Sequence, residues 1–156
     1  MERNEGIRTG ERASRFTGEL YRMYQKELAS MITYLHQSVA AASCSPAAER
    51  LLEEIALADM RQCRRLALFL QKRGILPTPG VRLRTAPPIR LGRDRERLEA
   101  LLRADIIEKE RCMGEYAALA DLASEPGAKD LLFALSEEER AHAATQRSFL
   151  DRLKRS

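Results

Sequence analysis

The spacing of helix-breaking residues divides this chain into four long segments that can each form a helix. Ser45 followed by Pro46 is a typical helix start, because serine can cap the first turn and proline fits the first helical position. Gly74 can end the helix that begins there, Asp94 can cap the next one, and Pro126 separates the last two segments. We therefore expect helices at about residues 12–43, 46–73, 94–124 and 127–154.

The connections between these segments differ in length. The first and last pairs are joined by only a few residues, which favours two antiparallel helical hairpins. Four prolines lie between residues 74 and 93, so this stretch cannot be helical and reads as an extended crossover between the hairpins. The expected fold is one all-α domain over residues 1–156, an antiparallel four-helix bundle with a long crossover at about 74–93.

Composition excludes several other classes. Only 5% of the 156 residues are aromatic, and the abundant Ala, Leu, Glu and Arg favour helices over strands. No apolar run approaches the roughly 20 residues needed to span a bilayer, and the N-terminus lacks an apolar leader, so neither a membrane span nor export is expected. Cys44, Cys63 and Cys112 have no zinc-ligand spacing and are odd in number, which suits reduced thiols in the cytoplasm.

The chain is basic, with 27 Lys and Arg against 23 Asp and Glu and a formal net charge of +4. Such a surplus could hold phosphate backbones, so a nucleic-acid-associated protein is one alternative. Acidic residues interleave with the arginines along most of the chain, and no nucleic-acid motif with interleaved aromatics is present. A solvated surface is therefore the expected reading, and nucleic acid is not an expected partner.

Each predicted helix carries an apolar stripe at helical spacing, as a bundle requires. The stripe residues are Leu20, Tyr24, Leu28, Met31, Tyr34, Leu35, Leu52, Ile55, Leu66, Phe69, Leu98, Leu102, Cys112, Tyr116, Leu119, Leu132, Leu135, Phe149 and Leu153. Near its midpoint each stripe is broken by polar residues on the same face. These are Glu27 on the first helix, Asp59 and Gln62 on the second, Asp105 and Lys109 on the third, and Glu139 and His142 on the fourth.

In an antiparallel bundle these breaks meet at one level, inside an apolar core. Isolated buried charges cost several kcal/mol each even after relaxation, so a metal or internal ion pairing must neutralise the cluster. The sequence thus predicts a polar centre that is neutralised in one of these two ways. The alternative is that the helix phases differ from those assigned and that some of these groups reach solvent.

With these residues the chain resembles the ferritin-like superfamily, in particular bacterioferritin, rubrerythrin and manganese-catalase relatives. Residues 53–62, EEIALADMRQ, followed by GILP at 74–77, look like the family's segment ending in Glu-Met-Arg-His and then a Gly and a Pro. Glu27 lies seven residues before Tyr34, as in the family, and Glu139-Arg-Ala-His142 looks like its second Glu-x-x-His. The resemblance covers nearly the whole chain and implies a site for two metals.

Residue by residue, the resemblance makes Glu27, Glu139 and His142 metal ligands, but other positions depart from the family. Asp59 stands where the family has Glu, one methylene shorter, and Gln62 stands where it has His. An amide oxygen is a weak ligand in place of an imidazole. The altered set argues against occupancy by two metals.

The third helix departs most from the family's ligand pattern. Its bridging Glu falls on Lys109, although Glu108 and Glu110 flank it and a one-residue change of phase would restore a carboxylate. If Lys109 faces the centre, its ammonium and the carboxylates of Glu27, Asp59 and Glu139 carry a net charge of −2. That charge suits one divalent ion, or a lysine that replaces the metal while His142 and one carboxyl are protonated.

Two main functions follow from the resemblance. In one, the di-metal site is degenerate, metal-free or with a single iron or manganese ion, and a central lysine–carboxylate network supports a structural or interaction module. In the other, Glu27, Asp59, Glu139 and His142 hold iron or manganese for peroxidase, catalase or ferroxidase chemistry. The resemblance also implies a homodimer, and an unidentified protein partner stays open. The sequence indicates no substrate.

Overall fold

Four α-helices make up the computed structural model of this chain, which describes residues 2–78, 91 and 93–156. They are α1 (Glu2–Ala41), α2 (Pro46–Lys72), α3 (Arg95–Leu122) and α4 (Pro126–Arg155). The described ranges contain no strand. This confirms the predicted all-α, four-helix architecture.

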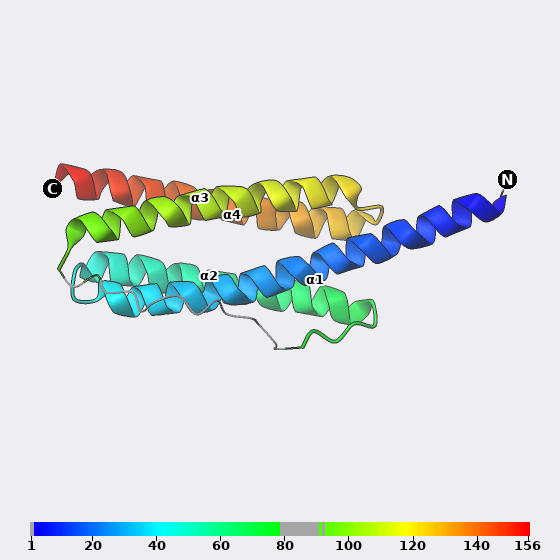
Figure 1. Ribbon diagram of the computed structural model, residues 1–156, viewed down its shortest axis with the longest axis horizontal. Coiled ribbons are helices and arrows are strands. Elements are labelled where there is room, and N and C mark those ends of the chain that lie inside the picture. The colour runs from blue at the N-terminus through cyan, green and yellow to red at the C-terminus, as the bar shows by residue number, and fades with distance from the viewer. Residues whose placement is uncertain (1, 79–90, 92) are drawn as a thin grey trace.

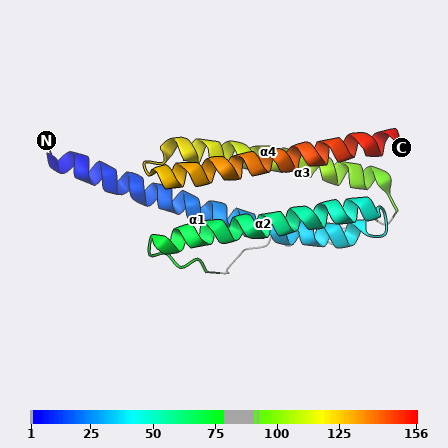
Figure 2. The same ribbon diagram turned by 180° about the vertical axis from the view of Figure 1, so that it is seen from behind.

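The helices pair as two antiparallel hairpins. Helix α1 packs along α2, and α3 packs along α4. Figures 1 and 2 show the two hairpins side by side as the two halves of one bundle. The short turn of each hairpin lies at the opposite end of the bundle from the turn of the other. Residues 79–90 and 92, which form most of the predicted crossover, lie outside the described residues.

Local sequence explains where α2 and α3 begin. The Ser45 side chain accepts a hydrogen bond from the backbone N–H of Ala48 at 3.2 Å, and Pro46 occupies the first turn. The Asp94 carboxylate accepts a bond from the N–H of Arg97 at 3.1 Å. Both residues cap the helices for which the sequence predicted them.

The end of α2 depends on a glycine. Gly74 has a φ of 79°, in the left-handed region that other residues avoid. Its N–H donates to the carbonyl of Gln71 at 2.9 Å, and the N–H of Ile75 donates to that of Leu70 at 3.0 Å. These bonds satisfy the last carbonyls of the helix and turn the chain away from it.

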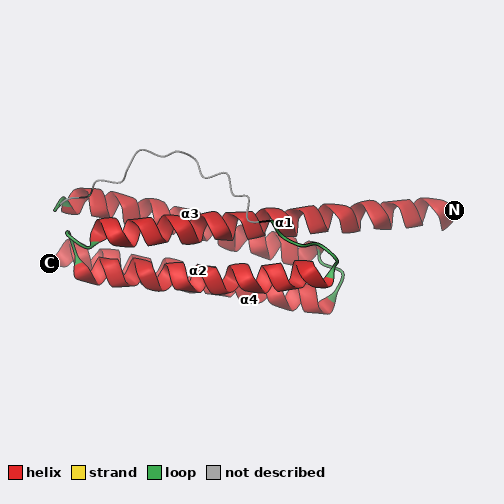
Figure 3. Cartoon of the chain, turned by 90° about the horizontal axis from the view of Figure 1, so that it is seen from below, coloured by secondary structure: helices red, strands yellow, loops and turns green. Residues whose placement is uncertain are grey.

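The prediction for the first helix was wrong at its N-terminus, because α1 begins at Glu2 instead of near residue 12. The apolar stripe on which the prediction rested starts only at Phe16, and residues 9–15 are exposed. No proline interrupts the segment before Pro46, so the helix continues outward from its packed part. Figures 1 and 3 show this end of α1 projecting beyond the other three helices.

The apolar core consists of two clusters. One is built around Leu20, Leu66 and Leu132, and the other around Leu52 and Leu102. The polar residues predicted to break the stripe lie between the two clusters, except Asp105, which lies within the second cluster between Leu102 and Ile106. The others share one level, as the sequence indicated.

The stripe prediction failed at one residue: Leu35 is 51% exposed. The inward face of α1 continues instead through Tyr34 and Ser38, both buried. As for membranes, none of the described helices is both long and apolar enough to cross one.

Candidate functional site

The polar centre is organised around the ammonium group of Lys109. Its Nζ lies 2.7 Å from Oδ1 of Asp59 and 3.0 Å and 3.3 Å from Oε2 and Oε1 of Glu139. Helices α2, α3 and α4 each supply one of these side chains, and all three are buried. The ring of Tyr34 on α1 completes the enclosure, with its centroid 5.0 Å from Nζ. An amine thus bridges two carboxylates at the middle of the bundle.

The phase of α3 is settled by burial. Lys109 is 2% exposed, whereas the side chains of Glu108 and Glu110 are 48% and 43% exposed. Glu108 forms a surface ion pair with Arg111. Lysine, and not a flanking carboxylate, therefore faces the centre.

Glu27 on α1 is buried beside this group. The hydroxyl of Tyr116 donates to its Oε1 at 2.5 Å, while Oε2 has no partner within the described residues. Burial, with the nearby charges of Glu139 and Asp59, raises the pKa of Glu27 to about 8. The Glu27 carboxyl therefore holds its proton to a higher pH than an ordinary glutamate does.

The remaining charges balance around the ammonium. Burial raises the pKa of Asp59, and Lys109 opposes that rise. Burial acts in the same direction on Glu139, but His142 and Lys109 together lower its pKa below the ordinary value. The two carboxylates in turn raise the pKa of Lys109 against the effect of burial. The raised pKa of Glu27 lowers the negative charge of the centre, and the ammonium of Lys109 pairs with the carboxylates of Asp59 and Glu139.

His142 lies at the edge of the centre, with its side chain 17% exposed. Its Nδ1 is buried, 3.8 Å from Oδ1 of Asp59 and 3.7 Å from Oε1 of Glu139, too far for hydrogen bonds. One ligand atom from each of these three residues lies within 4.8 Å of the others. They form the group that could hold a single metal ion.

Gln62 is buried but directed away from that group. Its Nε2 donates to Oε2 of Glu138 at 3.0 Å, and the other oxygen of Glu138 pairs with Arg65. The amide thus links α2 to α4 near the surface. Its Oε1 has no partner among the described residues, and nothing directs it toward a metal.

The sequence analysis missed two residues that donate hydrogen bonds to carboxylates of the polar centre. The hydroxyl of Ser30 donates to Oδ2 of Asp59 at 2.6 Å, and Nε2 of Gln37 donates to Oδ1 of Asp105 at 3.0 Å. Both follow from the inward series of α1, since they lie three residues after Glu27 and after Tyr34. Extending that series beyond the apolar residues would have found them.

Asp105 titrates near neutral pH. Burial raises its pKa to about 7, although Gln37 and Lys109 act in the opposite direction. An unfolded chain ionises this group near its ordinary pKa of 3.8. The folded state therefore holds the proton more tightly, and the stability from this group is present at acidic pH and is lost as the pH rises through about 7.

We predict that Asp105→Asn, which fixes the neutral form, stabilises the protein at pH 8 by roughly 2–4 kcal/mol and has little effect near pH 4. Urea unfolding at the two pH values measures the difference. Asp121→Asn, at an exposed position of the same helix, is the control and should show no such pH dependence. Equal effects of Asp105→Asn at both pH values would contradict the raised pKa of Asp105.

A dinuclear metal centre does not fit these residues. Lys109 stands at the position where the resemblance to the ferritin-like family implies a bridging carboxylate, and its Nζ already lies between Asp59 and Glu139. A protonated amine has no lone pair for a metal and repels cations. Gln62 faces Glu138, and Glu27 bonds to Tyr116 instead of to the centre.

Four long helices in two hairpins with inward carboxylates define a ferritin-like fold. Comparison with solved structures supports this class. The X-ray structure of the Desulfovibrio desulfuricans bacterioferritin, described with its diiron site in different catalytic states, superposes with a TM-score of 0.76. The match covers 93% of this chain and 83% of that one at 17% sequence identity, so it shows the fold alone. No protein-family model and no curated protein matches the sequence.

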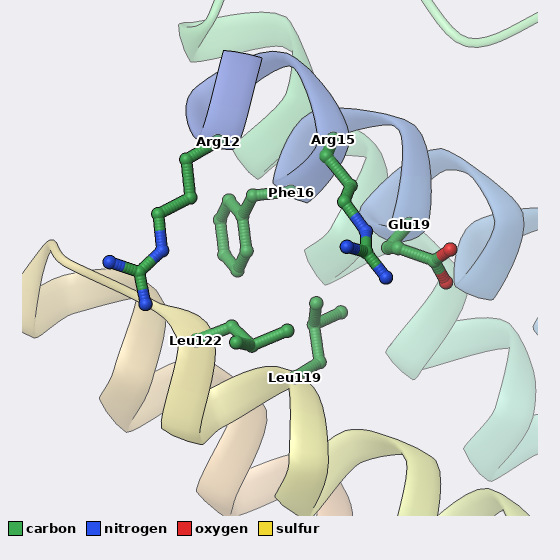
Figure 4. A pocket seen from close by; sticks show the side chains of 6 residues that line it. All are labelled: Arg12, Arg15, Phe16, Glu19, Leu119 and Leu122. Atoms are coloured by element: carbon green, nitrogen blue, oxygen red, sulfur yellow. The ribbon is translucent and has the colours of Figure 1, made fainter. Parts of the chain in front are cut away.

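A surface pocket of about 140 Å³ lies apart from the polar centre, where α1 leaves the bundle beside the end of α3 (Figure 4). Phe16, Leu119 and Leu122 form its apolar part, and Arg12 and Arg15 lie at its rim. None of the residues of the polar centre lines this pocket. We assign it no part in the function of that centre.

Proposed function

We propose that this protein is a ferritin-like bundle whose di-metal site is degenerate and whose centre is closed by a lysine–carboxylate network. It serves as a structural or interaction module in the form of a homodimer in the cytoplasm. The observation that carries the proposal is the ammonium of Lys109, which contacts Asp59 and Glu139 at 2.7 Å and 3.0 Å. Its positive charge stands where the fold would otherwise need a metal ion. The three unpaired cysteines, Cys44, Cys63 and Cys112, support a reducing compartment.

Metal content tests this proposal. We expect less than about 0.1 ion of iron or manganese per chain in protein purified without affinity metals from cells grown with both metals added. Mass spectrometry of the purified protein gives the stoichiometry. About one or two ions per chain would contradict a metal-free centre.

The second candidate is a protein that holds one iron or manganese ion for redox chemistry. The grouping of Asp59, Glu139 and His142, with ligand atoms within 4.8 Å, favours it. Carboxylate oxygens and an imidazole suit both metals. If metal is found, His142→Ala should remove it, whereas His36→Ala at an exposed position of α1 should not.

A further inference from the structure

The surface pocket between α1 and the end of α3 has an apolar floor. The side chains of Phe16 and Leu119, which are 8% and 5% exposed, form this floor, and Leu122, which is 49% exposed, forms a wall beside it (Figure 4). The volume of about 140 Å³ is close to the roughly 150 Å³ of an engineered apolar cavity that binds benzene. The pocket therefore has room for one aromatic ring or one short alkyl chain.

The floor is held in place by the end of α2. Cζ of Arg73 lies 5.2 Å from the ring centroid of Phe16 and 5.0 Å from that of Phe69. Nη2 of Arg73 also pairs with the carboxylate of Glu125 at 2.6 Å. Arg73 does not itself line the pocket. Phe16 is therefore fixed by contacts outside the pocket, which keeps the pocket formed without a ligand.

The edge of the pocket carries two arginines. Arg12 and Arg15 are exposed, and neither forms an ion pair within the part of the chain that the structure describes. Figure 4 shows their guanidinium groups on opposite sides of the Phe16 ring, both directed toward α3. Glu19, the acidic residue of the lining, already pairs with Arg22 at 2.9 Å. Together the charged side chains of the lining carry a net charge of +1.

The charge and shape of the pocket indicate the chemistry of a ligand. A guanidinium presents paired N–H donors that match the two oxygens of a carboxylate. A net charge of +1 suits a single negative charge, and Glu19 would repel the second charge of a phosphate dianion. The apolar floor suits a ring or an alkyl group next to that carboxylate. Binding such a group would also cover the exposed side of Leu122.

We propose that this pocket binds a small apolar monocarboxylate, such as an aryl acid or a short alkyl acid. The carboxylate lies between Arg12 and Arg15, and the apolar group lies on the pocket floor. The residues of the polar centre take no part in this binding. The inference therefore goes beyond the proposed function and does not depend on whether the polar centre holds a metal.

Titration of the isotope-labelled protein with phenylacetate, followed through its amide chemical shifts, tests the proposal. We expect shifts at residues 12–19 and 119–122 and a Kd of about 1 mM. Phenylacetamide has the same ring and nearly the same size but no charge, so it should bind at least about tenfold more weakly. If these residues do not shift at about ten times the expected Kd, the site is wrong. Equal affinity for phenylacetate and phenylacetamide would overturn the role of the arginines.

Three variants separate the charged edge from the apolar part. Arg12→Gln and Arg15→Gln should each weaken binding of phenylacetate by about 3- to 10-fold and leave binding of phenylacetamide unchanged. Leu122→Ser removes an apolar wall and should weaken binding of both compounds by about the same factor as each other. All three positions are exposed, so the variants should keep the fold, and circular dichroism checks that they do.

Arg50→Gln is the matched control for the change in charge. Arg50 is exposed near the start of α2, away from the pocket, so its replacement should leave the affinity for phenylacetate unchanged. If Arg50→Gln weakens binding as much as Arg12→Gln does, phenylacetate associates with the basic surface in general and the proposed pocket is wrong.

Discussion

Lys109→Met should destabilise the protein by about 3–5 kcal/mol, the usual cost of removing one member of a buried charged network. Methionine has nearly the volume of the lysine stem, so the variant removes the charge without opening a large cavity. What it leaves behind is Asp59 and Glu139, both buried and deprived of the ammonium that contacts them. Urea unfolding at pH 7 measures the loss.

Two further variants separate the loss of the buried Lys109 charge from the effect of replacing any lysine. Lys129→Met removes an exposed lysine of α4 and should change the unfolding free energy by less than about 0.5 kcal/mol. Combining Lys109→Met with Glu139→Gln should recover part of the loss, because one uncompensated charge is removed. A loss below about 0.5 kcal/mol in Lys109→Met itself would show that the ammonium is not needed to neutralise the centre.

The fold could be predicted from the sequence because the residues that start and end its helices lie close to those ends in the chain. Ser45 and Asp94 cap helices that begin where their side-chain chemistry indicates. The prediction was less accurate at the N-terminus, where α1 extends to Glu2 without packing that an apolar stripe could reveal. A periodic apolar pattern indicates the buried face of a helix. An exposed, polar extension of a helix has no buried face, so it shows no such pattern.

The residues of the polar centre could also be predicted from the sequence, for a related reason. A charged residue on an apolar stripe is costly, so Asp59, Lys109 and Glu139 stand out wherever the phase of the helix is known. Their shared level followed from antiparallel packing of helices of similar length. Spacing could not reveal the directions of individual side chains. Gln62 turns to Glu138 because that neighbour offers a carboxylate acceptor next to Arg65, and such a choice depends on tertiary contacts.

The distinction between a metal centre and an ammonium centre depends on two positions in particular. At position 109 the chain has a cation where a bridging carboxylate would be needed, and at position 62 it has an amide where an imidazole would be needed. Glu27, Asp59, Glu139 and His142 are otherwise gathered from three helices, α1, α2 and α4, around one level. In the proposed degenerate site the two departures support each other, because each would remove part of the ligand set that the resemblance implies.

Combining Gln62→His with Lys109→Glu should therefore create a centre that binds iron or manganese. The two substitutions supply a fourth carboxylate and a second imidazole, and four carboxylates balance the charge of two divalent ions. Without metal, the variant buries several carboxylates with no cation among them, so we expect it to be much less stable than the wild type. Metal that binds only the folded state should then stabilise it by about 2.7 kcal/mol at a free concentration of 100 times Kd.

The measurements are metal stoichiometry and the shift of Tm on adding ferrous or manganous ions. We expect about two ions per chain in the double variant, and a rise in Tm that is absent from the wild type. Gln62→His alone keeps the ammonium of Lys109 beside Asp59 and Glu139, so it is the matched control and should stay metal-free. If the double variant folds but binds no metal, the assignment of positions 62 and 109 to a lost ligand set is wrong. If Gln62→His alone binds metal, the ammonium does not exclude it and the imidazole alone was missing.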